Sequence, residues 1–133
     1  MRIAKLIFML IGLALLTGCG DDPSKPYIKI VGGGFTNDVV SNIVTYSVAI
    51  KRLKTLPSGS VIEATFDLPN TDRKYVTVEP TDANKDKYLL HSEALQGLKK
   101  NVPLTVKLRL LEAAGGKELA EVEKSFQSDV DQE

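Results

Sequence analysis

Cysteine and histidine are the side chains best suited to nucleophilic and acid–base chemistry, and this sequence of 133 residues contains one of each. Cys19 follows an apolar segment near the N-terminus, and His91 lies far from it along the chain. General-base catalysis or metal ligation would require partners for His91. The sequence offers neither a Ser/Cys–His signature nor a second cluster of ligands. We therefore assign no catalytic, cofactor-binding or metal-ligating residue, and we do not expect an enzyme.

Oxygen-bearing side chains recur between Asp82 and Glu93 at the spacing of a calcium-binding loop. Asp82, Asn84, Asp86 and Glu93 match positions 1, 3, 5 and 12 of that template. Position 6 of the template needs glycine for a sharp turn, and here it is Lys87. The flanking residues are typical of strands, whereas the template requires helices. We interpret the segment as a polar turn followed by an exposed strand, with a calcium site as the alternative.

Three consecutive glycines, Gly32–Gly34, follow the first apolar segment beyond the N-terminal region. A phosphate-binding loop would require spaced glycines, then Lys and Ser or Thr, and then a helix. None of these features follows the glycines. The run is more typical of a bend or bulge in a strand.

The N-terminal residues have the order of a secretory signal peptide. Arg2 and Lys5 precede an unbroken apolar run, Leu6–Leu16, and small residues follow it. This run is too short to cross a bilayer as a helix, which needs about 20 apolar residues. We therefore expect a cleaved signal peptide over residues 1–18 and no transmembrane anchor.

The sequence Leu16-Thr17-Gly18-Cys19 resembles the lipobox of bacterial lipoprotein precursors. The resemblance implies that residues 1–18 are removed and that Cys19 is acylated, through its sulfur and its new amine, so that residues 19–26 form a lipidated tether. An ordinary signal peptide that leaves a free cysteine is the alternative. In enterobacterial lipoproteins an Asp after the cysteine favours the inner membrane. Gly20 stands there, so the resemblance favours the periplasmic face of the outer membrane.

The charge of the chain is balanced, with 17 basic and 17 acidic residues. Removal of Arg2 and Lys5 would leave 15 basic residues (17 − 2) against the same 17 acidic ones. A mildly acidic protein of this kind gives no support for nucleic-acid binding. With a single cysteine, the mature protein would hold no internal disulfide, and its length suits one domain.

Alternating apolar and polar residues predict strands along most of the remaining chain. Strands are expected within 27–31, 42–50, 60–68, 74–79, 87–92 and 103–110. Residues 117–126 have features of both a helix and a strand, and we favour a strand because a glycine-bearing loop precedes them. The residues expected to face the interior are Val44, Tyr46, Val48, Ile50, Ile62, Ala64, Phe66, Leu68, Val76, Val78, Leu104, Val106, Leu108 and Leu110.

Seven short strands at fairly regular spacing predict an all-β sandwich over residues 27–127, followed by an acidic C-terminal tail, 128–133. The segment LQGLKKNVPLTVKLRLLEAAGGKELAEVEKSF, residues 95–126, resembles the end of an immunoglobulin-like or fibronectin type III domain. The resemblance implies seven antiparallel strands in two sheets. The tyrosine that such domains often carry in their sixth strand would fall near Leu104.

A fold of this kind hosts many functions, and we expect a non-catalytic envelope module that binds or scaffolds another envelope protein. A module for small ligands or carbohydrates is the alternative, and a metal-dependent enzyme is a weaker one. If the sandwich topology holds, several basic residues share the end of the domain beside the tether, where they would face anionic lipid. Ordinary solubility is the competing explanation for them. These residues are Lys51, Arg52, Lys54, Lys85, Lys87 and Lys117.

Overall fold

The computed structural model describes residues 25–38 and 40–132, and the regular structure of this part consists of β-strands. No described residue belongs to a helix that could span a bilayer. The prediction of a strand within 117–126 is confirmed, and the helical alternative is wrong. The strands are β1 (Ile28–Asp38), β2 (Ile43–Arg52), β3 (Val61–Asp67), β4 (Lys74–Pro80), β5 (Lys87–His91), β6 (Leu104–Leu111) and β7 (Glu118–Phe126).

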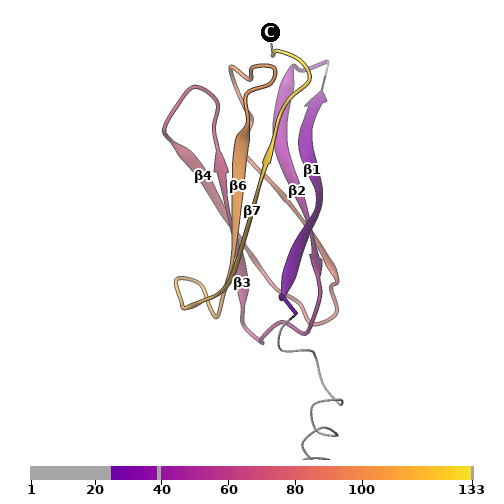
Figure 1. Ribbon diagram of the computed structural model, residues 1–133, viewed down its shortest axis with the longest axis vertical. Helices are drawn as coiled ribbons and strands as arrows, with labels where there is room; N and C mark the ends of the chain where they lie inside the picture. The colour runs from indigo at the N-terminus through magenta and orange to yellow at the C-terminus, as the bar shows by residue number, and fades with distance from the viewer. Residues whose placement is uncertain (1–24, 39, 133) are drawn as a thin grey trace, which may run out of the picture.

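The strands form two sheets that pack face to face (Figure 1). One sheet has the order β1-β2-β5 and the other has the order β4-β3-β6-β7, and all the pairings are antiparallel. In the immunoglobulin constant-type sandwich the fourth strand belongs to the first sheet. Here β4 pairs with β3 in the second sheet, so the first sheet has three strands and the second has four. The prediction of a single β-sandwich is therefore confirmed.

The alternation of apolar residues explains why these segments pair as strands with one buried face. Successive side chains of a strand point to opposite sides of the sheet, so every second residue of β2, β3 and β6 enters the space between the sheets. Tyr46 on β2, Phe66 on β3 and Leu108 on β6 are fully buried there. The sequence predicted the interior face of these three strands correctly.

The interior face of β4 was predicted wrongly. Val76 and Val78 are 52% and 47% exposed and point away from the other sheet. The half-buried Tyr75 lies on the interior side instead, with its ring centre 6.4 Å from that of Phe66. Because β4 is at the edge of its sheet, the long tyrosine side chain is enough to cover the core from this position.

The strand order determines which loops share an end of the sandwich. The start of β1 and the loops β2–β3, β4–β5 and β6–β7 lie at one end, which we call the tether end (Figure 1). The C-terminal segment lies at the opposite end (Figure 1). There the amide of Gln132 donates to the carbonyl of Leu98 at 2.8 Å, and the amide of Asn101 donates to that of Ser128 at 3.0 Å. Residues 128–132 are thus attached to the loop between β5 and β6.

Candidate functional site

Cys19, the proposed lipidation site, and the preceding signal peptide lie outside the described residues. The same holds for most of the tether expected at residues 19–26. The remaining predicted residues belong to the sandwich, where their surroundings are visible.

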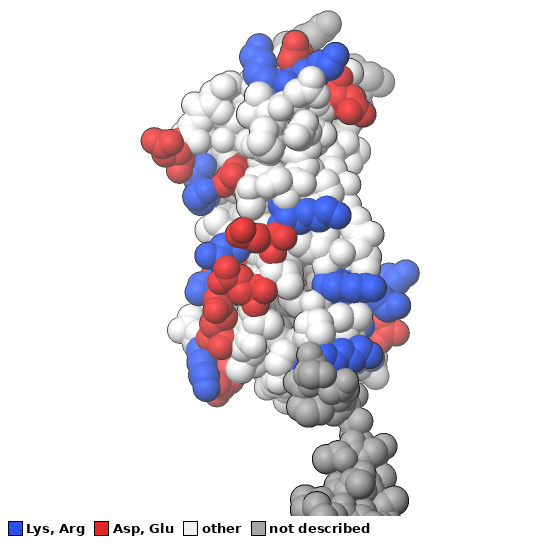
Figure 2. Space-filling model, in the orientation of Figure 1, with Lys and Arg blue, Asp and Glu red and all other residues white. Residues whose placement is uncertain are grey.

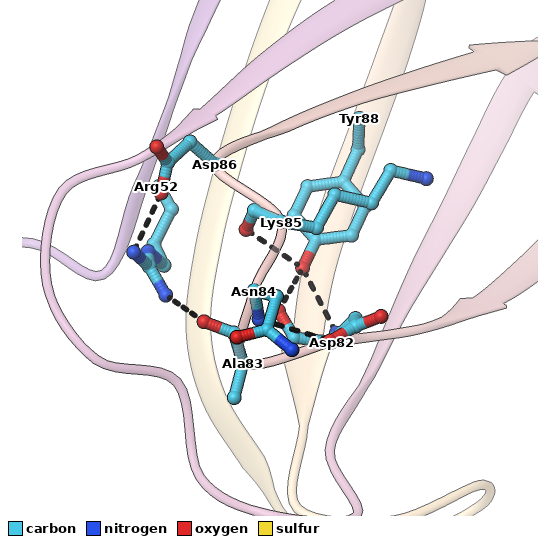
Figure 3. Close-up of polar contacts among 7 residues, drawn as sticks. All are labelled: Arg52, Asp82, Ala83, Asn84, Lys85, Asp86 and Tyr88. Carbon is cyan, nitrogen blue, oxygen red and sulfur yellow. Dashed lines mark hydrogen bonds and ion pairs between the residues drawn. The ribbon is translucent and has the colours of Figure 1, made fainter.

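The residues that match the calcium-loop template do not converge on one point. Asp86 accepts a hydrogen bond from Arg52 at 2.5 Å at the tether end (Figure 3), while Glu93 pairs with Arg73 at 3.2 Å beyond the other end of β5. The carboxylate of Asp82 accepts a hydrogen bond from the amide of Asn84 at 2.9 Å. Within the described part of the chain, no group of three potential ligands is placed to hold a metal ion.

The loop between β4 and β5 is held instead by its own polar contacts (Figure 3). Arg52 donates to the carbonyl of Ala83 at 2.9 Å, and the hydroxyl of Tyr88 accepts a hydrogen bond from the amide of Asp82 at 3.1 Å. The Asp82–Asn84 contact is the local hydrogen bond that favours Asp in turns. The segment is thus a polar turn before a strand, as the sequence indicated.

His91 lies on the outer face of the three-stranded sheet and is exposed. Its Nδ1 atom is 2.9 Å from the hydroxyl of Ser47 on the neighbouring strand. The carboxylate of Glu93, two residues later, is engaged by Arg73. A serine–histidine pair needs a third group that orients the histidine to form a catalytic triad, and the described residues place no carboxylate there.

The three glycines lie inside β1 rather than in a phosphate-binding loop. The register between β1 and β2 shifts between Ile30 and Gly32, which marks a β-bulge. At Gly33 a Cβ atom would lie 2.7 Å from the carbonyl oxygen of Ser47 and 2.8 Å from the ring of Phe126. The glycines therefore permit a bulge and a close approach between β1, β2 and β7, as expected for glycine in a strand.

Several of the basic residues predicted at the tether end interact with other side chains. Arg52 pairs with Asp86, and Lys85 pairs with Glu79 at 3.0 Å. The ammonium of Lys54 lies 4.2 Å from the centre of the Tyr27 ring. The loops of this end thus supply less unpaired charge than the sequence suggested.

The outer face of the four-stranded sheet carries a shallow groove of about 660 Å³, which we call the charged groove. Arg109 on β6 donates to Glu63 at 2.7 Å and lies 3.7 Å from Glu118, while Lys107 lies 3.5 Å from Glu121. The hydrogen bond to Glu63 raises the pKa of the Arg109 guanidinium, as does the negative charge of that carboxylate. The lining residues are Glu63, Thr65, Asp67, Lys74, Thr105, Lys107, Arg109, Glu118, Glu121 and Glu123.

The charged groove combines five carboxylates with three cations, so it is acidic overall even though each cation has a carboxylate partner. Red and blue side chains are interleaved along the lower left flank of the molecule in Figure 2. Aromatic stacking platforms for sugars or bases are missing from the lining residues. The four tyrosines of the chain are buried or half-buried. The charged groove therefore offers charged and hydroxyl groups to its surroundings, without aromatic faces among its lining residues.

The edge strand β4 borders the charged groove, and it is the longest edge strand whose pairing has no bulge or register shift. Natural sheets blunt their edges with bulges, charges or short strands. A bulge interrupts β1, the register shifts within the β6–β7 pair, and β5 has only five residues. The pairing of β4 with β3 continues without a shift from Lys74 to Pro80.

Two valines extend this edge onto the outer surface. Val76 and Val78 both lie on the outer side of β4, where their register partners on β3 are Thr65 and Glu63. The alternating pattern of residues 74–79 predicted that both valines face inward, so this surface was not expected. The presence of Pro80 in the same segment was a usable signal, since proline in a sheet is confined to edges, strand ends and bulges.

No protein-family model matches the chain, and no curated protein matches its sequence.

Proposed function

We propose that this chain is a non-catalytic bacterial envelope lipoprotein, anchored through acylated Cys19, whose sandwich binds or scaffolds another envelope protein. The lipobox-like residues 16–19 support the anchor. The resemblance to lipoprotein precursors, with Gly20 after the cysteine, favours the periplasmic face of the outer membrane as its location.

The observation that carries the binding function is the regular edge of β4, whose pairing with β3 runs from Lys74 to Pro80 without a bulge. Sandwich and sheet domains accept an extended peptide as an additional strand, in which backbone hydrogen bonds give affinity and side-chain contacts give specificity. The straight edge of β4 offers the unpaired backbone, and Val76 and Val78 offer adjacent apolar contacts. A partner strand with apolar side chains beside basic ones would match both the valines and the acidic groove.

A crosslinking experiment in intact cells tests this function. A photoreactive amino acid at Val76 should form an adduct with one defined envelope protein. Replacement of Val78 by Lys should lower the adduct yield about tenfold, because the burial of a valine contributes about 1.5 kcal/mol. Val130→Lys is the matched control, since Val130 is 58% exposed in the distant C-terminal segment.

The same strain background tests the anchor separately. The Cys19→Ser protein should leave the membrane fraction, since the acyl chains would be lost. An adduct that is insensitive to Val78→Lys, or equally sensitive to Val130→Lys, would contradict binding at β4. Membrane retention of the Cys19→Ser protein would contradict the anchor.

A further inference from the structure

The strand pairing places three lysines in one row across the outer face of the three-stranded sheet. Lys29 on β1 is the register partner of Lys51 on β2, and Lys51 is the register partner of Lys87 on β5. All three side chains are exposed. Neighbouring strands lie about 4.8 Å apart, so the row spans about 10 Å. Like charges directly opposite one another destabilise a sheet, so the row calls for a functional explanation.

These lysines differ from Arg52 and Lys85 at the same end, which pair with Asp86 and Glu79. Among the described residues, none of the three forms an ion pair. The nearby carboxylate of Asp86 is engaged by Arg52. The row therefore presents three unpaired positive charges to its surroundings.

The next positions along the same face are apolar or small. Gly32 on β1, Ala49 on β2 and Leu89 on β5 are register partners, and Val31 lies in the adjoining bulge. Leu89 is 56% exposed and Val31 is 46% exposed. The following positions are Gly34, Ser47 and His91, without a carboxylate. Cations beside exposed apolar side chains are typical of surfaces that rest on a membrane interface.

The two outer faces of the sandwich thus have opposite electrostatic character. The groove on the four-stranded sheet holds five carboxylates and three cations. The lysine row stands on the other sheet. In Figure 2 the lower right flank of the molecule is mainly blue, whereas the lower left flank carries mixed charges. An anionic plane would attract the three-stranded sheet and leave the charged groove and β4 facing away from it.

The position of the row brings it within reach of the bilayer. Lys29 is the second residue of β1, at the tether end. Lys29 lies ten positions after Cys19, which limits the distance between them to about 36 Å even in a fully extended chain. A row of charges spread along a flat sheet suits an array of headgroups better than one bound anion.

We propose that the lysine row Lys29–Lys51–Lys87 and the adjoining Leu89 dock the three-stranded sheet on the anionic lipid surface that holds the anchor. This inference rests on the proposed anchoring through Cys19. Docking orients the sandwich so that the β4 edge and the charged groove remain available to a partner.

A nitroxide label on the acylated protein tests the orientation. In that protein the sulfur of Cys19 is blocked, so a Leu89→Cys variant carries one reactive thiol. Val78→Cys is the matched control, because Val78 is an exposed apolar residue on the opposite sheet. Both are reconstituted in vesicles of phosphatidylcholine alone or mixed with phosphatidylglycerol. The readout is the accessibility of each label to oxygen and to an aqueous nickel complex.

The label at position 89 should enter the lipid only with phosphatidylglycerol at low salt, and the label at position 78 should stay in water. Lys29→Gln, Lys51→Gln and Lys87→Gln together should lower the docking equilibrium about a hundredfold, at about fivefold per lysine. The matched triple variant changes Lys99, Lys100 and Lys124 to Gln and should leave docking nearly unchanged. Salt of about 1 M should release the sheet, since the Debye length falls to about 3 Å.

A label at position 89 that stays aqueous on both kinds of vesicle overturns the proposal, and this is also the result expected if the row binds an acidic protein. Equal effects of the two triple variants overturn it as well. If the protein does not float with vesicles, the anchor is wrong. Lipid binding by the lysine row is then tested by whether the unacylated chain sediments with phosphatidylglycerol vesicles in a salt-sensitive way. The absence of such sedimentation refutes lipid binding by the lysine row, independently of the anchor.

Discussion

The hydroxyl of Tyr46 makes a buried hydrogen bond between the two sheets, and its removal is a direct test of how the sandwich is held together. The side chain is fully buried on β2 and its hydroxyl donates to the carbonyl of Leu104 on β6 at 2.8 Å. Its ring packs against those of Phe35, Phe66 and Phe126, with centres 4.8, 5.2 and 5.8 Å away. Tyr46→Phe keeps these ring contacts and deletes the hydrogen bond.

The expected loss of stability follows from the chemistry of that single contact. A hydrogen bond inside a protein contributes about 0.5–1.5 kcal/mol net, and an acceptor left unpaired adds to the loss. We therefore expect Tyr46→Phe to lower the free energy of unfolding by about 1.5 kcal/mol. For a domain of this size, about 4 °C of Tm corresponds to each kcal/mol, which gives a decrease of about 6 °C.

Urea denaturation and thermal melts of the wild-type protein and two variants measure this loss. Tyr75→Phe is the matched control, because Tyr75 is half-buried and its hydroxyl has no hydrogen-bond partner among the described residues. Its free energy of unfolding should change by less than about 0.5 kcal/mol. Equal stability losses in the two variants, or no loss in Tyr46→Phe, would refute the role assigned to the contact with Leu104.

Two further predictions concern the same core. Burial, and secondarily the charge of Asp67, raises the pKa of the Tyr46 hydroxyl in the folded protein. The folded state therefore favours the neutral tyrosine. This contribution to stability is fully present below about pH 10, and it is lost as the pH rises further. Melts between neutral pH and about pH 11 should show an alkaline destabilisation that is smaller in Tyr46→Phe than in the wild-type protein; identical profiles would contradict it. Gly33→Ala should destabilise the domain by about 1–3 kcal/mol in urea, because its Cβ would meet the Ser47 carbonyl and the Phe126 ring. A stability equal to wild type would show that β1 moves away without strain.

The resemblance to fibronectin type III-like domains did not predict this contact. Such domains often carry a tyrosine on the sixth strand, which would fall near Leu104. The structure instead brings a tyrosine from β2 to the carbonyl of that residue. Alternation predicted that Tyr46 faces inward. Its hydrogen-bond partner, 58 residues away, depends on how two sheets stack, which a local pattern does not contain.

The candidate surfaces also depend partly on local sequence and partly on the pairing of distant strands. Lys29, Lys51 and Lys87 are each readable in the sequence as an outward residue of a strand, but they form a row only through the registers of β1, β2 and β5. The residues that match the calcium template are close in the sequence but are separated in the structure. Their spacing is local, whereas β5 carries Glu93 away from the loop that holds Asp86.

Local patterns in the sequence were enough to predict the number of strands and the buried faces of β2, β3 and β6, and they suggested the lipid anchor at Cys19. These depend on alternation over a few residues and on a contiguous motif, both of which are properties of neighbouring positions. The position of β4 at an edge, and with it the exposure of Val76 and Val78, became visible from the pairing of the strands in space. Whether a strand has one neighbour or two is decided by hydrogen bonds to distant segments, and the alternating pattern of a strand is the same in both cases.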